Sequence, residues 1–319
     1  MMMRLASRGS ALALWQARHV QARLLAAHDG LHIDIDVVTT TGDRVTDVPL
    51  AQIGDTGLFT REVDLAVLDG RAEFAVHSLK DVPTRPPEGL ALAAVPERED
   101  ARDALLIGAD GAASLASLPP GARIGTSSLR RRALLLAMRP DLTILDLRGN
   151  LDTRLARLRA GHYDAIVLAA AGLRRLGWDD QITELLDPPD WLPAAGQGAL
   201  GIVCRADDAH TLERLAVLDH PATRQATTAE RTLLRTLEGG CQIPIGALAR
   251  VAGDQLQLHA FVAALSGTTS VRGTRTGSAA DAAAIGAALA ADMIADGAAR
   301  ILDEVRAQGT EGVPRPTAP

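Results

Sequence analysis

Lysine, cysteine and aromatic residues are all scarce in this chain of 319 residues. Aromatic residues make up only 2% of it, so aliphatic side chains and alanine must fill the core. The two cysteines, Cys204 and Cys241, lie far apart, which excludes the disulfide-rich scaffold of small secreted proteins. No stretch approaches the roughly 18 uninterrupted apolar residues of a membrane span, and residues 1–8 lack the apolar run of a signal peptide. These absences predict a cytoplasmic protein that has no membrane partner.

The single lysine is Lys80, and Asn150 is the single asparagine. A GC-rich genome explains this bias, because lysine and asparagine codons are rich in A. A lysine that persists where arginine could be encoded has then resisted replacement, since an ammonium point charge and a guanidinium fork are not interchangeable in a tight site. Lys80 is therefore a candidate functional residue.

Net charge excludes one large class of partners and points to another. The chain has a formal charge of −6, which argues against nucleic-acid binding. Residues 123–178 nevertheless contain eleven arginines against four aspartates. This basic segment could be a solvated surface, or it could line a cleft for a small polyanion.

Short apolar strands alternate with helical segments from residue 4 to residue 204. Such alternation is typical of βαβ units that build a mostly parallel sheet. A charged passage at 96–100 and a proline-rich run at 187–193 predict two crossings between two α/β domains, and the strand at 199–204 could return to the first. The expected strands are 4–6, 32–38, 73–77, 104–107, 123–125, 143–147 and 165–169, and the expected helices are 11–27, 61–69, 129–138, 151–160 and 173–176.

The last third has a different pattern, which predicts a small α+β domain. A long helix is expected from Pro221 to about Leu237, and three short strands with tight turns follow it, as in an antiparallel sheet. An alanine-rich helix is then expected from Ser278 to about Val305. The predicted domains are 1–96 with 196–216, then 97–195, then 217–308, followed by a flexible tail at 309–319.

The segment 75–83 carries the first candidate chemistry. Its polar residues follow a buried strand, and α/β folds place ligands at the carboxyl ends of their parallel strands. Lys80 could hold a carboxylate there, and Asp81 could ionise or share a proton with a reacting nitrogen. The alternative for this pair is an ordinary surface ion pair at a strand end.

Arginines and hydroxyl residues recur where other expected strands run into helices. Thr126, Ser127 and Ser128 precede Arg130 and Arg131, and exposed N–H groups at a helix start beside arginines favour an anion. Capping explains one hydroxyl but not three in a row. Cations early in a helix oppose its dipole, so stability alone does not place them there. The arginines that recur in this way at the next two strand ends are Arg148, Arg154, Arg174 and Arg175.

Cys241 follows two glycines in a segment that presents its thiol on a loop. Cys204, in contrast, lies in an apolar strand typical of a packing residue. Cys241 could therefore be reactive, with a purely structural role as the alternative. No cysteine and histidine spacing predicts a zinc site, so no metal is expected, and no phosphate-binding or dinucleotide-binding loop is present.

In combination and in this order, these segments resemble the porphobilinogen deaminase (hydroxymethylbilane synthase) family. The resemblance rests on HSLKD at 77–81, GTSSLRR at 125–131, LRGNLDTR at 147–154 and GGCQIP at 239–244, with further support at 5–16 and 193–198. It implies two periplasmic-binding-protein-like α/β domains and a C-terminal domain with a three-stranded antiparallel sheet. It also implies a transferase (EC 2.5.1.61) that condenses four porphobilinogen molecules head to tail with loss of ammonia and releases hydroxymethylbilane by hydrolysis.

The family implies a dipyrromethane cofactor joined by a thioether to Cys241, one per chain, and names Asp81 as the catalytic carboxylate that stabilises developing positive charge. The residues implied to hold the cofactor are Ser78, Lys80, Asp81, Thr126, Ser128, Arg130, Arg131 and Arg154. Those implied to hold the incoming substrate and growing pyrrole chain are Arg8, Ser10, Gln16, Arg148, Arg154 and Arg175.

One segment departs from the family, because many relatives carry lysine where this chain has Thr56 and Arg61. Any lysine-dependent role of that loop is therefore in doubt. The expected oligomeric state is a monomer. Two alternatives stay open from the residues alone: a two-domain anion-binding protein, and a pyridoxal-phosphate enzyme that uses Lys80 as its Schiff base.

Overall fold

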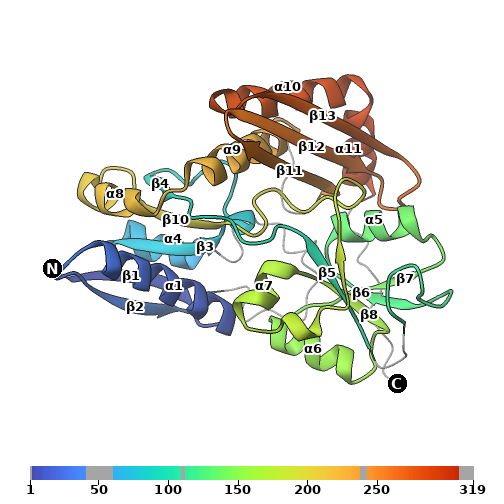
Figure 1. The fold of residues 1–319 in the computed structure, drawn as a ribbon, viewed down its shortest axis with the longest axis horizontal. Helices are drawn as coiled ribbons and strands as arrows, with labels where there is room; N and C mark the ends of the chain where they lie inside the picture. Colours follow the sequence, from blue (N-terminus) through green and yellow to red (C-terminus); the bar gives the residue numbers. More distant parts are fainter. Residues whose placement is uncertain (1, 41–59, 109–111, 238–242, 309–319) are drawn as a thin grey trace.

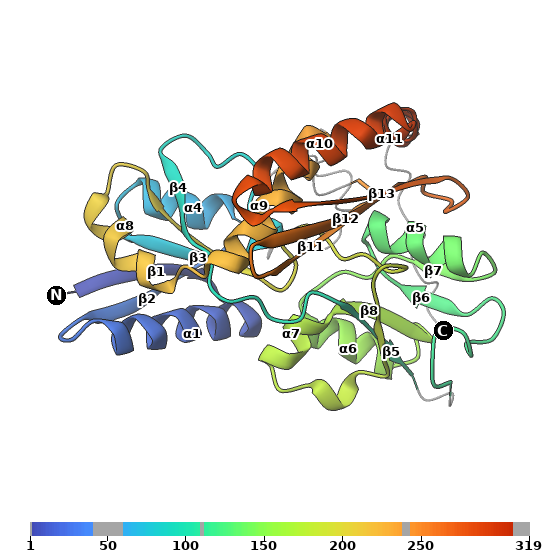
Figure 2. The ribbon, with the colours of Figure 1, turned by 45° about the horizontal axis from the view of Figure 1, so that its top comes forward.

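The computed structural model describes residues 2–40, 60–108, 112–237 and 243–308, and these residues form three sheets with helices packed around them. Figure 1 shows the first sheet and its helices in blue and cyan, except for residues 200–215 in gold; the second is mainly green, and the third is orange and red. The view in Figure 2 places the third sheet and its helices above the second group and to the right of the first. The expected tail at 309–319 lies outside the described residues.

The first sheet has five strands in the order β2-β1-β3-β10-β4. Strand β1 pairs in parallel with β2 and β3, whereas β10 pairs antiparallel with β3 and β4. The predicted return of the chain to this sheet is therefore confirmed. The bounds are β1 Met2–Arg8, β2 His32–Val38, β3 Phe74–Ser78, β4 Leu90–Ala94 and β10 Leu200–Arg205, with helices α1 Ala11–Ala27, α4 Arg61–Leu68 and α8 Ala209–Leu215.

The second sheet has five strands in the order β7-β6-β8-β5-β9. Strand β6 pairs in parallel with β7 and β8, and β5 pairs antiparallel with β8 and β9. Both five-stranded sheets are thus mixed, and the expectation of a mostly parallel sheet needs that correction. The bounds are β5 Asp103–Ile107, β6 Arg123–Gly125, β7 Thr143–Leu145, β8 Ala165–Ala169 and β9 Glu184–Leu186, with helices α5 Leu129–Met138, α6 Leu151–Arg159 and α7 Ala170–Arg175.

The third sheet is the expected antiparallel one, with its strands in the order β11-β12-β13. Leu248 and Phe261 of this sheet share a buried cluster with Trp191 and the second sheet. Gly297 has a φ of 100°, and there the long helix expected from Ser278 divides into two. The bounds are α9 Pro221–Thr236, β11 Ile245–Ala252, β12 Gln255–Ala263, β13 Ser270–Ser278, α10 Ala282–Ala295 and α11 Ala298–Ala307.

Glu230 on α9 joins the two crossing segments to the third sheet. Its side chain is fully buried and forms a two-point ion pair with Arg98, with N–O distances of 2.6 and 3.1 Å. The backbone N–H groups of Gly196 and Ala249 donate to the same carboxylate at 2.7 and 2.8 Å. A charged side chain this deeply buried needs such partners, because an unpaired carboxylate would lose its hydration without compensation. One carboxylate therefore fixes both crossings against α9 and β11.

Membrane-spanning potential is limited in the part of the chain that the structure describes. No single helix there is long and apolar enough to cross a bilayer. Residues 279–295 and 298–307 pass the test of length and composition only as a pair, and this pair is bent by 78°.

Candidate active site

The end of β3 carries the first group of predicted site residues. Ser78 closes the strand, and a 3-10 turn, Leu79–Asp81, presents Lys80 and Asp81 as half-buried side chains. Leu79 between them is fully buried, and its N–H donates to the Ala199 carbonyl at 2.9 Å. This buried anchor holds its two polar neighbours at the edge of the sheet.

Two glutamines support this turn from other segments. Gln16 of α1 is almost fully buried, and its Nε2 donates to Ser78 Oγ at 2.9 Å. Lys80 Nζ lies 3.4 Å from Gln197 Oε1. Gln197 stands between Gly196 and Gly198, whose positive φ angles of 75° and 86° favour glycine. A Cβ on Gly198 would lie 2.3 Å from the Glu99 carbonyl oxygen, so this tight passage requires glycine.

Lys80 has an unusual charge environment. Burial, together with the nearby Arg131 and Arg130, lowers the pKa of its ammonium group to about 8, although Asp81 and Asp103 oppose the shift. Desolvation is the largest of these causes, and it lowers the pKa of a lysine because it disfavours the charged form. Lys80 therefore loses its proton at a lower pH than an exposed lysine does.

Arg130 and Arg131 begin α5, as the sequence predicts, but both are buried. Ser128 caps the helix, accepting from the Arg131 N–H at 3.4 Å, and Thr126 Oγ1 accepts from the Ser128 N–H at 3.2 Å. Ser127 Oγ donates to the Leu147 carbonyl at 2.6 Å. The three hydroxyls thus organise the loop between β6 and α5, and the arginines lie behind it.

Asp103 is the residue of this region that sequence reasoning missed. It is fully buried at the start of β5, and it pairs with Arg130 Nη1 and Arg131 Nη2, both at 2.7 Å. Trp191 Nε1 and Gln197 Nε2 also donate to it, at 2.7 and 2.8 Å. The two arginines hold the pKa of this carboxyl well below its usual range, despite the opposing effect of burial. An aspartate opening a short apolar strand was the one available signal in the sequence.

Arg154 extends the same cationic region from α6. Its Nε donates to the Gly149 carbonyl at 2.7 Å. Burial and the positive charges of Arg131 and Arg148 lower its pKa to about 10, while Asp146 and Asp81 act in the opposite direction. These electrostatic interactions bring residues from β3, α5 and the β7–α6 connection into one site.

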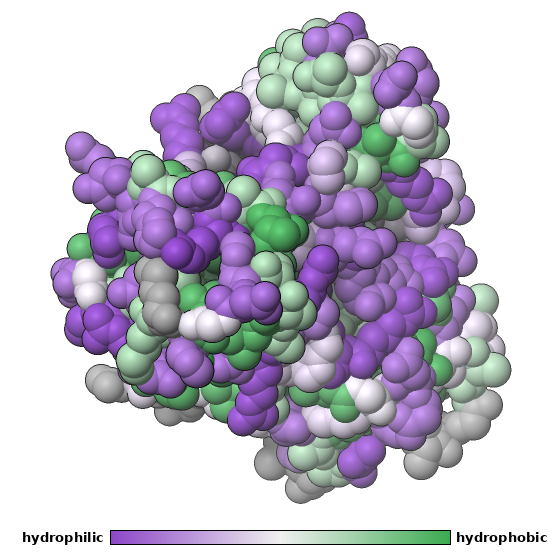
Figure 3. All heavy atoms as spheres, turned by 60° about the vertical axis from the view of Figure 1, so that its left-hand side comes forward, coloured by the Kyte–Doolittle hydropathy of each residue, from purple (hydrophilic) through white to green (hydrophobic). Residues whose placement is uncertain are grey.

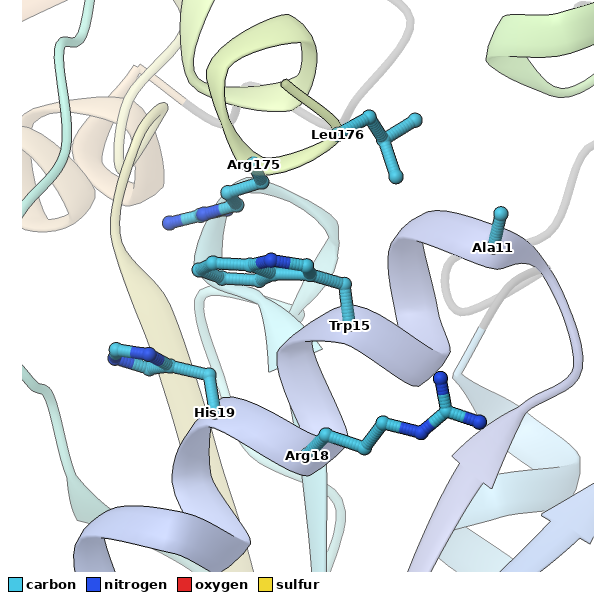
Figure 4. Close-up of a pocket in the computed structure, with 6 residues that line it drawn as sticks. All are labelled: Ala11, Trp15, Arg18, His19, Arg175 and Leu176. Carbon is cyan, nitrogen blue, oxygen red and sulfur yellow. The ribbon is translucent and has the colours of Figure 1, made fainter.

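Arg175 lies apart from that group, in a pocket of about 430 Å³ between α1 and α7. Figure 4 shows its guanidinium over the Trp15 ring, with His19 against the other face of the ring. The guanidinium carbon is 5.8 Å from the Trp15 centroid, and the two rings stack at 4.9 Å. Arg175 Nη2 also donates to the Gly198 carbonyl at 2.7 Å, and burial lowers its pKa to about 10.

The remaining predicted residues lie in other elements or outside the described residues. Ser10 caps α1, accepting from the Ala13 N–H at 3.3 Å, and Arg8 ends β1 beside it. Cys241 and Thr56 lie outside the described residues, whereas Arg61 begins α4. Cys204 is buried in β10, where burial raises the pKa of its thiol to about 11, as expected of a packing residue.

Comparison with known proteins gives two family models that cover most of the chain. The porphobilinogen deaminase dipyrromethane cofactor-binding domain matches residues 3–213, and the porphobilinogen deaminase C-terminal domain matches residues 224–295. The chain belongs to the porphobilinogen deaminase family. It is accordingly a transferase of tetrapyrrole biosynthesis (EC 2.5.1.61), with a dipyrromethane cofactor-binding domain.

Relatives within the porphobilinogen deaminase family are similar over almost their whole length. The enzyme of Roseiflexus castenholzii is 52% identical over 93% of this chain and 97% of its own. The enzyme of Nitratidesulfovibrio vulgaris is 52% identical over 96% and 97%, and that of Syntrophobacter fumaroxidans 49% over 95% and 97%. Membership of this family decides against the anion-binding protein and the pyridoxal-phosphate enzyme as alternatives.

Solved structures give only a weak likeness in fold. An arginine-specific periplasmic binding protein of Salmonella typhimurium covers 68% of this chain at 13% identity, with a TM-score of 0.39. A score this low carries no argument. The two α/β groups and the antiparallel sheet predicted for a porphobilinogen deaminase are established by the sheet topology itself.

The described site suits a cofactor that carries several carboxylates. Lys80, Arg130, Arg131, Arg148 and Arg154 outnumber the three neighbouring aspartates at positions 81, 103 and 146. Burial is the largest cause of the lowered pKa values of Lys80 and Arg154, and the neighbouring arginines lower them further. Anionic groups bound here would favour the charged forms of both side chains. Among the described residues, no group of three or more His, Cys, Asp or Glu side chains could hold a metal ion.

Proposed function

We propose that this porphobilinogen deaminase assembles its tetrapyrrole on a dipyrromethane primer attached to Cys241, with Asp81 as the catalytic residue. The observation that supports this most strongly is the position of Asp81. It is half-buried beside Lys80, at the carboxyl end of β3, and it interacts electrostatically with Arg154 from the other α/β group. A carboxylate in such a partly dry site stabilises positive charge more strongly than one in water.

When bound, the dipyrromethane supplies the covalent attachment point from which the pyrrole chain grows. Lys80, Arg130, Arg131 and Arg154 would hold its acetate and propionate groups, because charge-assisted contacts in a half-buried site contribute about 1.5–3 kcal/mol each. Thr126 and Ser128 shape the helix start beside them. Ser78 completes the set, and its hydroxyl already accepts from Gln16.

The substrate would be held from the other side of the site. Arg8 and Ser10 at the β1–α1 junction, Gln16 on α1, and Arg148, Arg154 and Arg175 are the proposed contacts for incoming porphobilinogen. Asp81 would then stabilise the cation that forms as ammonia leaves, and again as the new carbon–carbon bond forms and the displaced proton departs. Four additions followed by hydrolysis would release hydroxymethylbilane.

The remaining proposals concern the molecule as a whole. We propose that residues 1–96 with 196–216, then 97–195, and then 217–308 act as three domains, and that the enzyme is a cytoplasmic monomer. Figure 3 supports the monomer on the face it shows, because hydrophobic residues there lie in small groups among hydrophilic ones. Large exposed hydrophobic residues such as Val37, Leu65 and Val217 come from separate elements.

Asp81→Asn tests the catalytic assignment. This variant keeps the shape of the side chain but removes its charge, so it should still carry the primer while single-turnover deamination falls by about 10²–10³. Asp81→Glu should be less impaired, since it displaces the charge without removing it. The exposed Asp34→Asn on β2 is the matched control and should react at the wild-type rate. A primed Asp81→Asn enzyme with wild-type rates would exclude Asp81 from the mechanism.

A further inference from the structure

We infer that Asp103 and Gln197 are positioning residues, which hold Lys80, Arg130 and Arg131 in the arrangement that receives the carboxylates of the primer. This inference rests on the proposed function of those three cations. It concerns two residues that do not themselves meet a ligand. The Asp103 network is defined here as Asp103, Gln197, Trp191, Arg130 and Arg131.

Asp103 has no capacity left for a ligand. Its Oδ2 accepts from Arg130 Nη1 and Trp191 Nε1, both at 2.7 Å. Its Oδ1 accepts from Arg131 Nη2 at 2.7 Å, from Arg131 Nε at 3.2 Å and from Gln197 Nε2 at 2.8 Å. A carboxylate offers about four lone-pair sites, so these five donors saturate it. Asp103 can act on a bound anion only through the groups that it holds.

The geometry fixes both guanidinium groups from two sides. Arg130 Nη1 also donates to the Leu192 carbonyl at 2.8 Å, and Arg131 Nη1 donates to the Val167 carbonyl at 2.8 Å. Each arginine is thus held by a carbonyl as well as by Asp103. Side chains preorganised in this way lose little conformational entropy when an anion binds.

Gln197 connects the network to the 3-10 turn after β3, which contains Lys80 and Asp81. Its Nε2 donates to Asp103 Oδ1 and to the Ala101 carbonyl, both at 2.8 Å, and its Oε1 accepts from Lys80 Nζ at 3.4 Å. Gln197 is almost fully buried in one crossing segment, and Ala101 belongs to the other. The amide of Gln197 therefore links both crossing segments, the turn after β3 and the start of β5.

Charge balance gives Asp103 a second effect on the same site. Its negative charge offsets the positive charges of two buried arginines. The same charge favours the protonated form of Lys80, whose pKa burial has lowered to about 8. Without this carboxylate, three cations would lie close together with no buried anion between them. Lys80 would then lose its proton at a lower pH and would bind a carboxylate less well.

The single lysine makes this inference directly measurable. Labelling the protein with ¹⁵N-lysine gives one side-chain signal, so the pKa of Lys80 can be read by NMR between about pH 6 and pH 10. The second readout is the fraction of protein that carries the primer, measured by intact mass. The variants are Asp103→Asn and Gln197→Met, and the matched control is Asp100→Asn, which lies in the same crossing segment and pairs with Arg102 and Arg174.

Asp103→Asn should lower the pKa of Lys80 by about half a unit or more and reduce primer content to less than about a tenth. Gln197→Met keeps the side-chain volume and charge but removes the link, so it should change both quantities in the same direction and less strongly. Asp100→Asn should change neither. If Asp103→Asn does not fold, Gln197→Met alone decides. A folded variant with the wild-type Lys80 pKa and full primer content would overturn the inference, while loss of turnover in primed Asp81→Asn would still support the proposed function.

Discussion

Glu230→Gln should destabilise the protein far more than its small chemical change suggests. Each Glu230 oxygen accepts one N–H from Arg98 and one from the backbone. A glutamine amide group would face two donors with its own NH₂, whichever way it turned. One of the two oxygen positions therefore loses both hydrogen bonds, and Arg98, with a side chain only 12% exposed, loses its counter-charge.

The expected magnitude follows from this geometry. Removing one partner of a buried ion pair costs about 3–5 kcal/mol. At about 2.1 cal/mol/K per residue, unfolding this chain has an entropy near 0.7 kcal/mol/K, so the melting temperature should fall by about 5–7 °C. The exposed Arg300–Glu304 pair on α11 provides the control. Glu304→Gln should cost about 0.5 kcal/mol or less, which is below about 1 °C.

Differential scanning calorimetry of the three proteins under identical primer loading measures these shifts. Equal primer loading is needed, because a bound group that stabilises only the folded state raises the melting temperature by itself. A Glu230→Gln protein that melts within about 1 °C of wild type would refute the assignment of Glu230 as the electrostatic anchor of the two crossings.

Two further predictions concern the arginine and lysine sites. Trp15→Leu removes the ring over which Arg175 lies, so the KM for porphobilinogen should rise about tenfold while primer content stays unchanged. An unchanged KM would show that Trp15 does not contribute to substrate binding. Assembly of the primer on primer-free protein should slow as the pH rises through about 8, because the Lys80 ammonium with its lowered pKa then loses its charge. In Lys80→Arg the rate of primer assembly should no longer fall near pH 8, because arginine keeps its charge. A fall near pH 8 that persists in this variant would show that another group causes it.

Much of the fold could be predicted because local patterns and tertiary packing agree. The bounds of α1, β2, β6 and α5 match the sequence expectation, since caps such as Ser10 and Ser128 mark where those helices begin. The break at Gly297 was missed because alanine-rich sequence on both sides favours continuous helix. Strand β9 was missed because its three residues become a strand only through pairing with β5.

The residue types of the candidate site could be predicted from the sequence, but the ion pairs and hydrogen bonds between these residues could not. Clustered arginines and a single lysine indicate a polyanion site, yet nothing local shows that Arg130 and Arg131 share Asp103, which is 27 and 28 residues away. Gln197 and Trp191 are further still along the chain. Such contacts depend on how two crossing segments meet, which periodicity does not encode. The catalytic role of Asp81 and the attachment to Cys241 remain predictions.

The central claim is that a two-pyrrole primer is attached to Cys241. Intact mass spectrometry of the purified active enzyme, followed by peptide mapping, tests it most directly. The mass should exceed the sequence mass by two linked pyrrole units, and the excess should map to the peptide that contains Cys241, with Cys204 unmodified. Active enzyme with an unmodified Cys241, or with the adduct on Lys80, would contradict the account.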